Sequence, residues 1–168
     1  MMPRRARPAD AACLAALAQW VWLDSYATQG IEARFLPYLA ESFRMGAFER
    51  LIVDPERVMW VLEEGAVLQG FAQLRRGAAA PVPGGAAPRV ELERLYVAPR
   101  LTGRGLGVAL MAAARSTWPA EALWLSVWAG NEGAQRFYRR EGGEVIGETT
   151  FVLDGQAHPN LVFGWPAR

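Results

Sequence analysis

Apolar residues recur at three- and four-residue intervals through the first third of the chain, and this spacing predicts helices. The first helix is expected to begin at Pro8 and Asp10, two residue types that favour helix starts, and to run to Tyr26. The same spacing predicts two further helices over residues 32–43 and 47–52. The amino-terminal third is therefore expected to be helical.

Apolar and polar residues alternate over most of the remaining chain, which predicts strands. Strands are expected over residues 57–63, 66–75, 89–97, 121–128, 144–153 and 156–163. Glu64-Gly65 predicts a turn between the first two strands, and Asp154-Gly155 is a strong hairpin signal between the last two. The sheet is therefore expected to contain two hairpins.

Two more helices are expected among the strands, over residues 104–117 and 131–141, the second opened by Asn131 as its cap. Residues 77–88 are rich in Ala, Pro and Gly and predict a flexible loop. This mixture predicts an α/β (α+β) fold with a mixed sheet. The length of 168 residues predicts one domain, residues 1–168.

Composition and charge narrow the classes of function. The formal net charge of +1 argues against a broad surface for nucleic acid or an anionic membrane. Neither a signal peptide nor an apolar run of membrane-spanning length is found. Cys13 and His158 are the only cysteine and histidine, which predicts no metal site. The lack of further cysteines and histidines fits a cytoplasmic protein. The composition, free of lysine and rich in Ala and Arg, suggests a bacterial genome rich in GC.

A glycine-rich turn, Thr102 to Gly107, lies between a predicted strand and a predicted helix. Glycines let the backbone approach a ligand, and the free amides at a helix start favour phosphate. Arg100 and Arg104 add positive charge. No Gly-Lys-Ser/Thr follows, which argues against a P-loop, and the third glycine comes too early for a dinucleotide-binding fingerprint. Alone, the turn predicts either an anion site or a tight turn without a ligand.

Two motifs in order resemble the GNAT (GCN5-related) N-acetyltransferase superfamily. Residues 93–99 followed by 103–107 resemble its acetyl-CoA signature, although Thr102 stands where that pattern has Arg or Gln. The segment 124–142, with Asn131 and Phe137-Tyr138, resembles the part that follows. The resemblance implies a mostly antiparallel mixed sheet, flanked by helices, in which a central parallel strand pair splays apart.

The resemblance also implies acetyl-CoA as cosubstrate and roles for individual residues. The pantetheine arm would pair with the strand near Leu95 and Val97, and the pyrophosphate would sit on the amides of the glycine-rich turn. The cofactor-contacting residues implied are Leu95, Tyr96, Val97, Arg100, Thr102, Gly103, Arg104, Gly105, Leu106, Gly107 and Asn131. Tyr138 matches the residue that protonates the departing CoA thiolate.

Acetyl transfer needs a neutral amine, yet an alkylamine has a pKa of about 10. A base must therefore remove a proton, directly or through water. Glu93 is the candidate base, and Glu91, on the same face of the strand, and bulk water are alternatives. Glu93 and Glu91 could also be solvated strand residues, and Tyr138 a core aromatic. His158 and Cys13 are interpreted as structural.

Within the superfamily, segments 124–128 and 151–156 resemble bacterial spermidine/spermine-type acetyltransferases. This implies transfer to a primary amine, a small cationic one such as a polyamine, which Asp24, Glu32 or Glu41 could attract. A protein or peptide N-acetyltransferase, or a non-catalytic acyl-CoA-binding regulatory module, is an alternative. Edge strands and exposed aromatics leave room for a homodimer.

Overall fold

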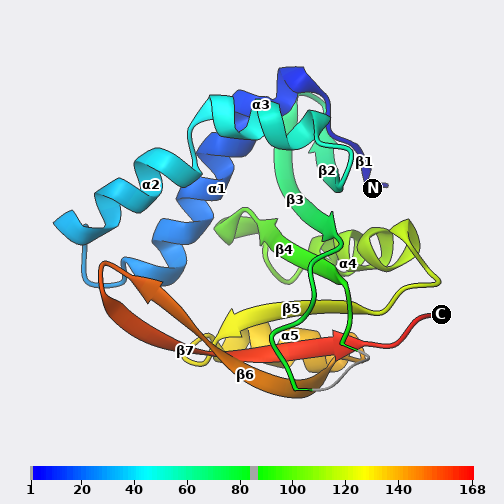
Figure 1. Ribbon diagram of the computed structural model, residues 1–168. Coiled ribbons are helices and arrows are strands. Elements are labelled where there is room, and N and C mark those ends of the chain that lie inside the picture. Colours follow the sequence, from blue (N-terminus) through cyan, green and yellow to red (C-terminus); the bar gives the residue numbers. More distant parts are fainter. Residues whose placement is uncertain (1, 84–86) are drawn as a thin grey trace.

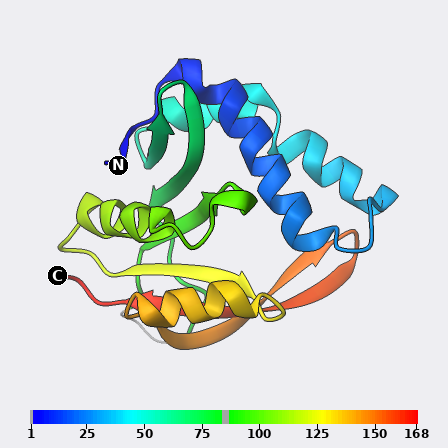
Figure 2. The same cartoon turned by 180° about the vertical axis from the view of Figure 1, so that it is seen from behind.

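The computed structural model describes residues 2–83 and 87–168, which form one mixed sheet covered by helices (Figures 1 and 2). The strands are β1 (Arg4–Arg5), β2 (Arg57–Glu64), β3 (Val67–Arg76), β4 (Val90–Val97), β5 (Leu123–Trp128), β6 (Glu144–Leu153) and β7 (Gln156–Trp165). The helices are α1 (Ala11–Tyr26), α2 (Leu36–Ser42), α3 (Met45–Val53), α4 (Leu106–Thr117) and α5 (Glu132–Arg140), with 3-10 turns η1 (Pro8–Asp10), η2 (Ala33–Phe35) and η3 (Pro99–Leu101).

The strand order across the sheet is β1-β2-β3-β4-β5-β7-β6. Neighbouring strands are antiparallel except β4 and β5, which run parallel. Their register pairs lie only at the amino-terminal ends, Val90 with Leu123 and Glu91 with Trp124, and beyond them the two strands diverge. The predicted fold class, a mostly antiparallel mixed sheet with a splayed parallel pair, is confirmed.

The two larger apolar cores lie on opposite faces of the sheet. One joins α1, α2 and α3 to residues such as Met59, Val61 and Phe71 of β2 and β3. The other joins α4 and α5 to residues such as Leu62 and Phe163. Figures 1 and 2 show the same division, with α1, α2 and α3 together, and with α4 and α5 behind the strands in Figure 1 and in front of them in Figure 2. Helices therefore cover both faces of the sheet. The middle of the sheet is accessible where β4 and β5 diverge.

The predicted loop 77–88 includes residues 84–86, which lie outside the described residues. Its described parts pack against the sheet beside β5, where Ala80 is buried. The indole nitrogen of Trp124 donates a hydrogen bond of 2.7 Å to the carbonyl oxygen of Ala78. This loop covers part of the face that α1 to α3 leave open.

Three local differences from the sequence prediction have physical causes. The two-residue strand β1 lacks any alternation to detect, and it is held in place by pairing with β2. The helix expected over 32–43 divides into η2 and α2, with Pro37 in the first turn of α2, where its missing N–H costs nothing. Helix α4 begins at Leu106 because Gly105 has a left-handed φ of 80°.

Among the described residues, no helix is long and apolar enough to cross a membrane.

Candidate functional site

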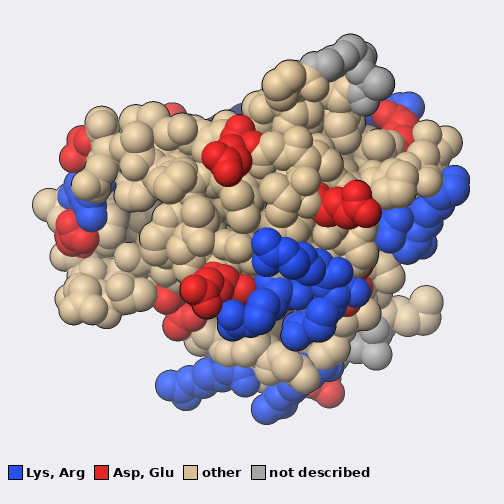
Figure 3. All heavy atoms as spheres, turned by 90° about the horizontal axis from the view of Figure 1, so that it is seen from below, with Lys and Arg blue, Asp and Glu red and all other residues tan. Residues whose placement is uncertain are grey.

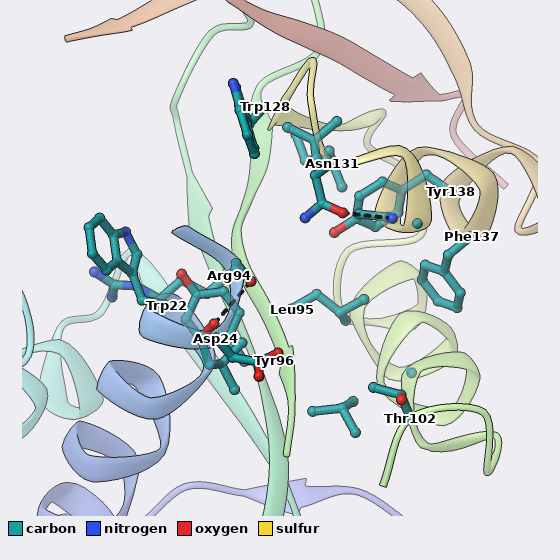
Figure 4. A pocket seen from close by; sticks show the side chains of 18 of the residues that line it. Trp22, Asp24, Arg94, Leu95, Tyr96, Thr102, Trp128, Asn131, Phe137 and Tyr138 are labelled. Atoms are coloured by element: carbon teal, nitrogen blue, oxygen red, sulfur yellow. Dashed lines mark hydrogen bonds between the residues drawn. The ribbon is translucent and has the colours of Figure 1, made fainter. Parts of the chain in front are cut away.

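A cavity of ≈ 850 Å³ passes through the sheet where β4 and β5 diverge. Residues of β4, β5, α4 and α5 line it on one side, and residues of α1, α2, β6 and β7 line it on the other. Figure 4 shows Leu95, Phe137 and Tyr138 pointing toward one another on one side of β4, and Trp22 and Asp24 on the other. Two ligands entering from opposite faces could therefore meet inside this cavity.

The splay leaves polar backbone groups without a strand partner. From Leu92 to Val97, β4 has no pairing with β5, although all of these residues except Glu93 stay paired with β3. Backbone N–H and C=O groups that face a gap need a partner, which a bound extended ligand can supply. Leu95 and Val97 line the cavity here.

The glycine-rich turn forms one end of the cavity. Gly103 and Gly105 have left-handed φ values of 77° and 80°, which residues with a side chain adopt only with strain. The turn leads directly into α4. The first backbone amides of α4 have no hydrogen-bond partner within the helix. A Cβ on Gly107 would lie 3.3 Å from the ring of Phe137, so this position allows α4 and α5 to approach each other. The geometry suits a phosphate group.

The predicted cofactor residues fall into two groups. Those that line the cavity are Leu95, Tyr96, Val97, Thr102, Gly103, Gly105, Leu106, Gly107 and Asn131. Arg100 and Arg104 are exposed and do not line it. The hydroxyl of Thr102 donates a 3.1 Å hydrogen bond to the carbonyl of Pro99, which stabilises the turn.

Tyr96 and Asn131 differ in how they meet the cavity. The ring of Tyr96 packs against Phe71 at 5.4 Å, on the α1 side of the sheet and away from the glycine-rich turn. The Oδ1 atom of Asn131 accepts a 3.0 Å hydrogen bond from the backbone N–H of Ala134, which caps α5. This bond orients the side chain of Asn131 at the cavity wall (Figure 4).

Tyr138 lies in α5 with its ring buried and its hydroxyl facing the cavity (Figure 4). The ring is fixed by Phe137, Phe163 and Trp165, with centroids 5.4, 5.8 and 6.0 Å away. The hydroxyl has no hydrogen-bond partner within residues 2–83 and 87–168. Burial raises the pKa of Tyr138 above its usual value. Its phenol is therefore a protonated group with a free donor at neutral pH.

A β-bulge at Glu93 changes the geometry expected for the two candidate bases. The register with β3 passes from Gln73–Arg94 to Leu74–Leu92, which leaves Glu93 as the extra residue. Strict alternation would place Glu93 and Leu95 on the same face. Instead, Leu95 packs on the α4 side, and Glu93 meets residues on the α1 side.

The carboxylate of Glu93 is held by several donors. Arg57 donates to both carboxylate oxygens at 3.2 and 3.3 Å, Gln73 donates to Oε2, and Arg75 Nε lies 3.5 Å from Oε1. Glu93 still lines the cavity, whereas Glu91 does not. Glu91 is half-buried beside Arg75, and burial raises its pKa although Arg75 opposes this.

Aromatic rings that the sequence did not single out as a group form the wall on the α1 side. Rings at consecutive centroid distances of 5.9, 5.3, 4.9 and 5.7 Å, which we call the aromatic arc, are those of Phe151, Tyr38, Trp22, Tyr26 and Trp128. All of them line the cavity. Only the helical spacing of Trp22 and Tyr26 could have linked any of these rings from the sequence.

Charge is unevenly distributed around this wall. Of the three acidic residues expected to attract a cation, Asp24 lines the cavity, and Glu32 and Glu41 do not. Within the described part of the chain, Asp24 has no ion-pair partner, whereas Glu32 is paired with Arg34 at 2.8 Å. On the face shown in Figure 3, one basic patch has acidic side chains around it, so this face has no single sign of charge.

Comparison with known proteins shows which family this chain belongs to. The model described as "Acetyltransferase (GNAT) family" matches residues 14–156. An uncharacterized N-acetyltransferase of Mycobacterium tuberculosis is 34% identical over 116 residues, which cover 67% of this chain and 69% of that protein. The peptidyl-lysine N-acetyltransferase YiaC of Escherichia coli is 29% identical over 107 residues, covering 64% of this chain and 62% of YiaC.

Solved structures share the fold. The PaiA N-acetyltransferase of Thermoplasma acidophilum, solved in complex with coenzyme A, has a TM-score of 0.72 at 20% identity, covering 95% of this chain and 96% of that one. Arabidopsis thaliana NAA60, solved in complex with acetyl-CoA, has a TM-score of 0.69 at 16% identity, covering 97% and 96%. At these identities the likeness concerns the fold.

Proposed function

Because the chain belongs to the acetyltransferase (GNAT) family, we propose that it transfers the acetyl group of acetyl-CoA to the primary amine of a small cationic acceptor, such as a polyamine. One observation carries this proposal. A single cavity joins the glycine-rich turn and the Tyr138 hydroxyl to a wall of aromatic rings with the unpaired carboxylate of Asp24. The first end suits a phosphate-bearing thioester, and the second suits an ammonium ion.

The residues on the α4 side would hold the cosubstrate, which supplies an acetyl thioester. Amides from Gly103 to Gly107 and the start of α4 would bind its pyrophosphate, with Arg100 and Arg104 adding charge from the solvent side. The unpaired edge of β4 near Leu95 and Val97 would bind the extended arm. An N–H of the same edge would polarise the carbonyl oxygen. Asn131 would contact the arm from α5.

In the transfer itself, the acceptor nitrogen forms a bond to the carbonyl carbon, and the bond from that carbon to sulfur breaks. Tyr138 donates its phenolic proton to the departing sulfur, so CoA leaves as a thiol. The proton that the amine has lost returns to Tyr138 through water. Burial keeps Tyr138 protonated before each turnover, because it raises the pKa of the phenol.

We assign the removal of the amine proton to water held at the bulge beside Glu93. The donors around Glu93 fill most of its lone-pair positions, so its carboxylate is better suited to orient water than to take the proton itself. Glu91 is outside the cavity and is a weaker candidate.

A polyamine is favoured by the resemblance of segments 124–128 and 151–156 to spermidine/spermine-type enzymes and by Asp24. We take residues 1–168 as one domain, acting in the cytoplasm of a bacterial cell, where acetyl-CoA is made. A homodimer is compatible with this proposal.

The second candidate acceptor is the lysine side chain of a protein. The observation in its favour is the relative named peptidyl-lysine N-acetyltransferase. A lysine ammonium has the same chemistry as a small amine, so the same wall could receive it. A regulatory module that binds acyl-CoA without turnover is disfavoured by the free Tyr138 hydroxyl in the cavity.

The test follows thiol release from acetyl-CoA with purified protein and a panel of amines and lysine peptides. Turnover with small cationic amines, at higher kcat/KM than with lysine peptides, is the expected result. Preference for peptides would replace the small-amine proposal with the second candidate. Binding of acetyl-CoA without turnover on any acceptor would support the regulatory module.

A further inference from the structure

The aromatic arc offers more ring faces for binding a cation than one reacting amine requires. It was defined above by the rings of Phe151, Tyr38, Trp22, Tyr26 and Trp128. Its rings come from α1, α2, β5 and β6, elements far apart in the chain. They form a continuous row in which each ring lies within 6 Å of the next. The faces of such rings attract a cation that lies within about 6 Å of the ring centroid.

Polar atoms beside the arc also lack partners. The Nε2 atom of His158 and the Oδ1 atom of Asn160 are buried and have no hydrogen-bond partner among the residues that the structure describes. His158 lies opposite Phe151 in the β6–β7 ladder, and Asn160 lies opposite Trp128 in the β5–β7 ladder. Both residues line the cavity. The amide oxygen of Asn160 is an acceptor, and Nε2 of His158 is one when its ring carries the proton on Nδ1, so a ligand with several N–H groups can satisfy both.

The cations near the arc are already engaged. The guanidinium of Arg94 donates to Gln73 at 2.6 Å and lies over the rings of Phe43 and Phe48. Arg34 is paired with Glu32 on the surface. Among the described residues that line this side of the cavity, Asp24 therefore carries the charge without an ion-pair partner, whereas Arg140, also without one, lines the cavity from α5. The aromatic rings of the arc, the carboxylate of Asp24 and the unpartnered atoms of His158 and Asn160 together favour binding of an ammonium group.

The Phe151 end of the arc is also distant from the reaction centre. The ring of Tyr138 packs against Phe163 of β7, whereas the arc meets β7 at Asn160, opposite Trp128. Three residues of strand separate these two positions, which is roughly 10 Å at about 3.3 Å per residue. An ammonium at the Phe151 end of the arc, which meets β7 at His158, lies still further along the strand and is therefore not the nitrogen that reacts near Tyr138.

We propose that the aromatic arc, with Asp24, His158 and Asn160, binds a second ammonium group of the acceptor, so that the enzyme selects diamines and longer polyamines over monoamines. This inference rests on the proposed function and specifies its acceptor. The first nitrogen of the acceptor reaches the thioester near Tyr138, and the second is held several methylene groups away. The arc residues set specificity and take no part in the transfer.

The test compares putrescine with butylamine and aminobutanol, which have four carbons but one amino group. The expected kcat/KM for putrescine is about tenfold higher or more. Phe151→Leu and Asp24→Asn should lower kcat/KM for putrescine much more than for butylamine, and so remove most of that advantage. Matched controls are Trp20→Leu and Glu41→Gln, which change exposed residues of α1 and α2 outside the cavity and should keep the preference.

A binding measurement makes the result independent of turnover. His158 is the only histidine, so the set of ¹H–¹⁵N correlations from an imidazole ring belongs to it without further assignment. In the CoA-bound protein, putrescine should shift this signal saturably, and butylamine at the same concentration should shift it far less. Gly130→Ala should weaken the effect, because a Cβ there would lie 2.5 Å from the ring of Trp128 and displace it.

The outcomes separate this inference from the proposed function. Equal kcat/KM for putrescine and butylamine, with both acetylated, would overturn the second-ammonium site and leave amine acetylation standing. A lysine peptide preferred over putrescine, with no effect of Asp24→Asn, would also overturn it. Failure of every amine to react would refute the proposed function, and the histidine signal would then show directly whether the arc binds putrescine.

Discussion

Replacing Tyr138 by Phe is the sharpest test of the proposed chemistry, because it removes one hydroxyl and little else. The ring would keep its contacts with Phe137, Phe163 and Trp165. The hydroxyl makes no hydrogen bond to any described residue, so its removal leaves no partner unsatisfied. We expect the free energy of unfolding to change by less than about 1 kcal/mol.

The catalytic effect should be much larger. A positioned general acid contributes roughly 10²- to 10⁴-fold, and a thiolate is a fair leaving group, so we expect kcat to fall by about 100-fold. Binding of acetyl-CoA should change by less than about threefold, because the proton is needed only as the bond to sulfur breaks. Steady-state thiol release gives kcat, calorimetry gives the affinity for acetyl-CoA, and thermal melting checks the fold.

Tyr38→Phe is the matched control, since it removes a hydroxyl from the same cavity at the aromatic arc. Its kcat should stay close to that of the parent protein. A Tyr138→Phe variant with kcat within about threefold of the parent, at unchanged melting temperature, would refute the assignment of Tyr138 as the acid.

Three further predictions concern the turn, the bulge and pH. Gly107→Val should weaken acetyl-CoA binding by about tenfold or more in calorimetry, because even a Cβ would lie 3.3 Å from Phe137 and force α4 from α5. Glu93→Gln should lower the free energy of unfolding in urea by about 1–3 kcal/mol, because Arg57 loses a charged partner. It should reduce kcat less than Tyr138→Phe does, and an equal loss would point to Glu93 as the base. Because burial raises the pKa of Tyr138 and the protonated form is the active one, kcat should show no fall as pH rises through about 10. A fall at or below that pH would contradict the raised pKa.

Much of the cofactor half of the site could be predicted from the sequence because its geometry is local. The strand before the turn, Gly103 and Gly105 with their left-handed φ, and the start of α4 lie within one short segment. Asn131 caps the helix that carries Tyr138. Each relation depends on neighbours a few residues apart, so spacing alone places these residues near one another.

The surroundings of Glu93 could not be predicted in this way. Alternation places Glu93 on the face of Leu95, and the bulge reverses this. The bulge depends on the register between β3 and β4, and the charges that hold Glu93 come from Arg57 on β2 and Arg75 on β3. No local pattern in β4 contains that information.

The acceptor half of the site is also hard to predict from the sequence, because its residues come from elements far apart in the chain. Trp22 and Phe151, at opposite ends of the chain, reach one wall only because the β6–β7 hairpin extends to the ends of α1 and α2 (Figures 1 and 2). The intervening ring of Tyr38 contacts both. A turn that binds phosphate needs the same backbone whatever the acceptor, whereas the aromatic arc can change one ring at a time without disturbing that backbone. The choice of acceptor is therefore encoded in the pairing of distant elements, and it has to be tested at the arc.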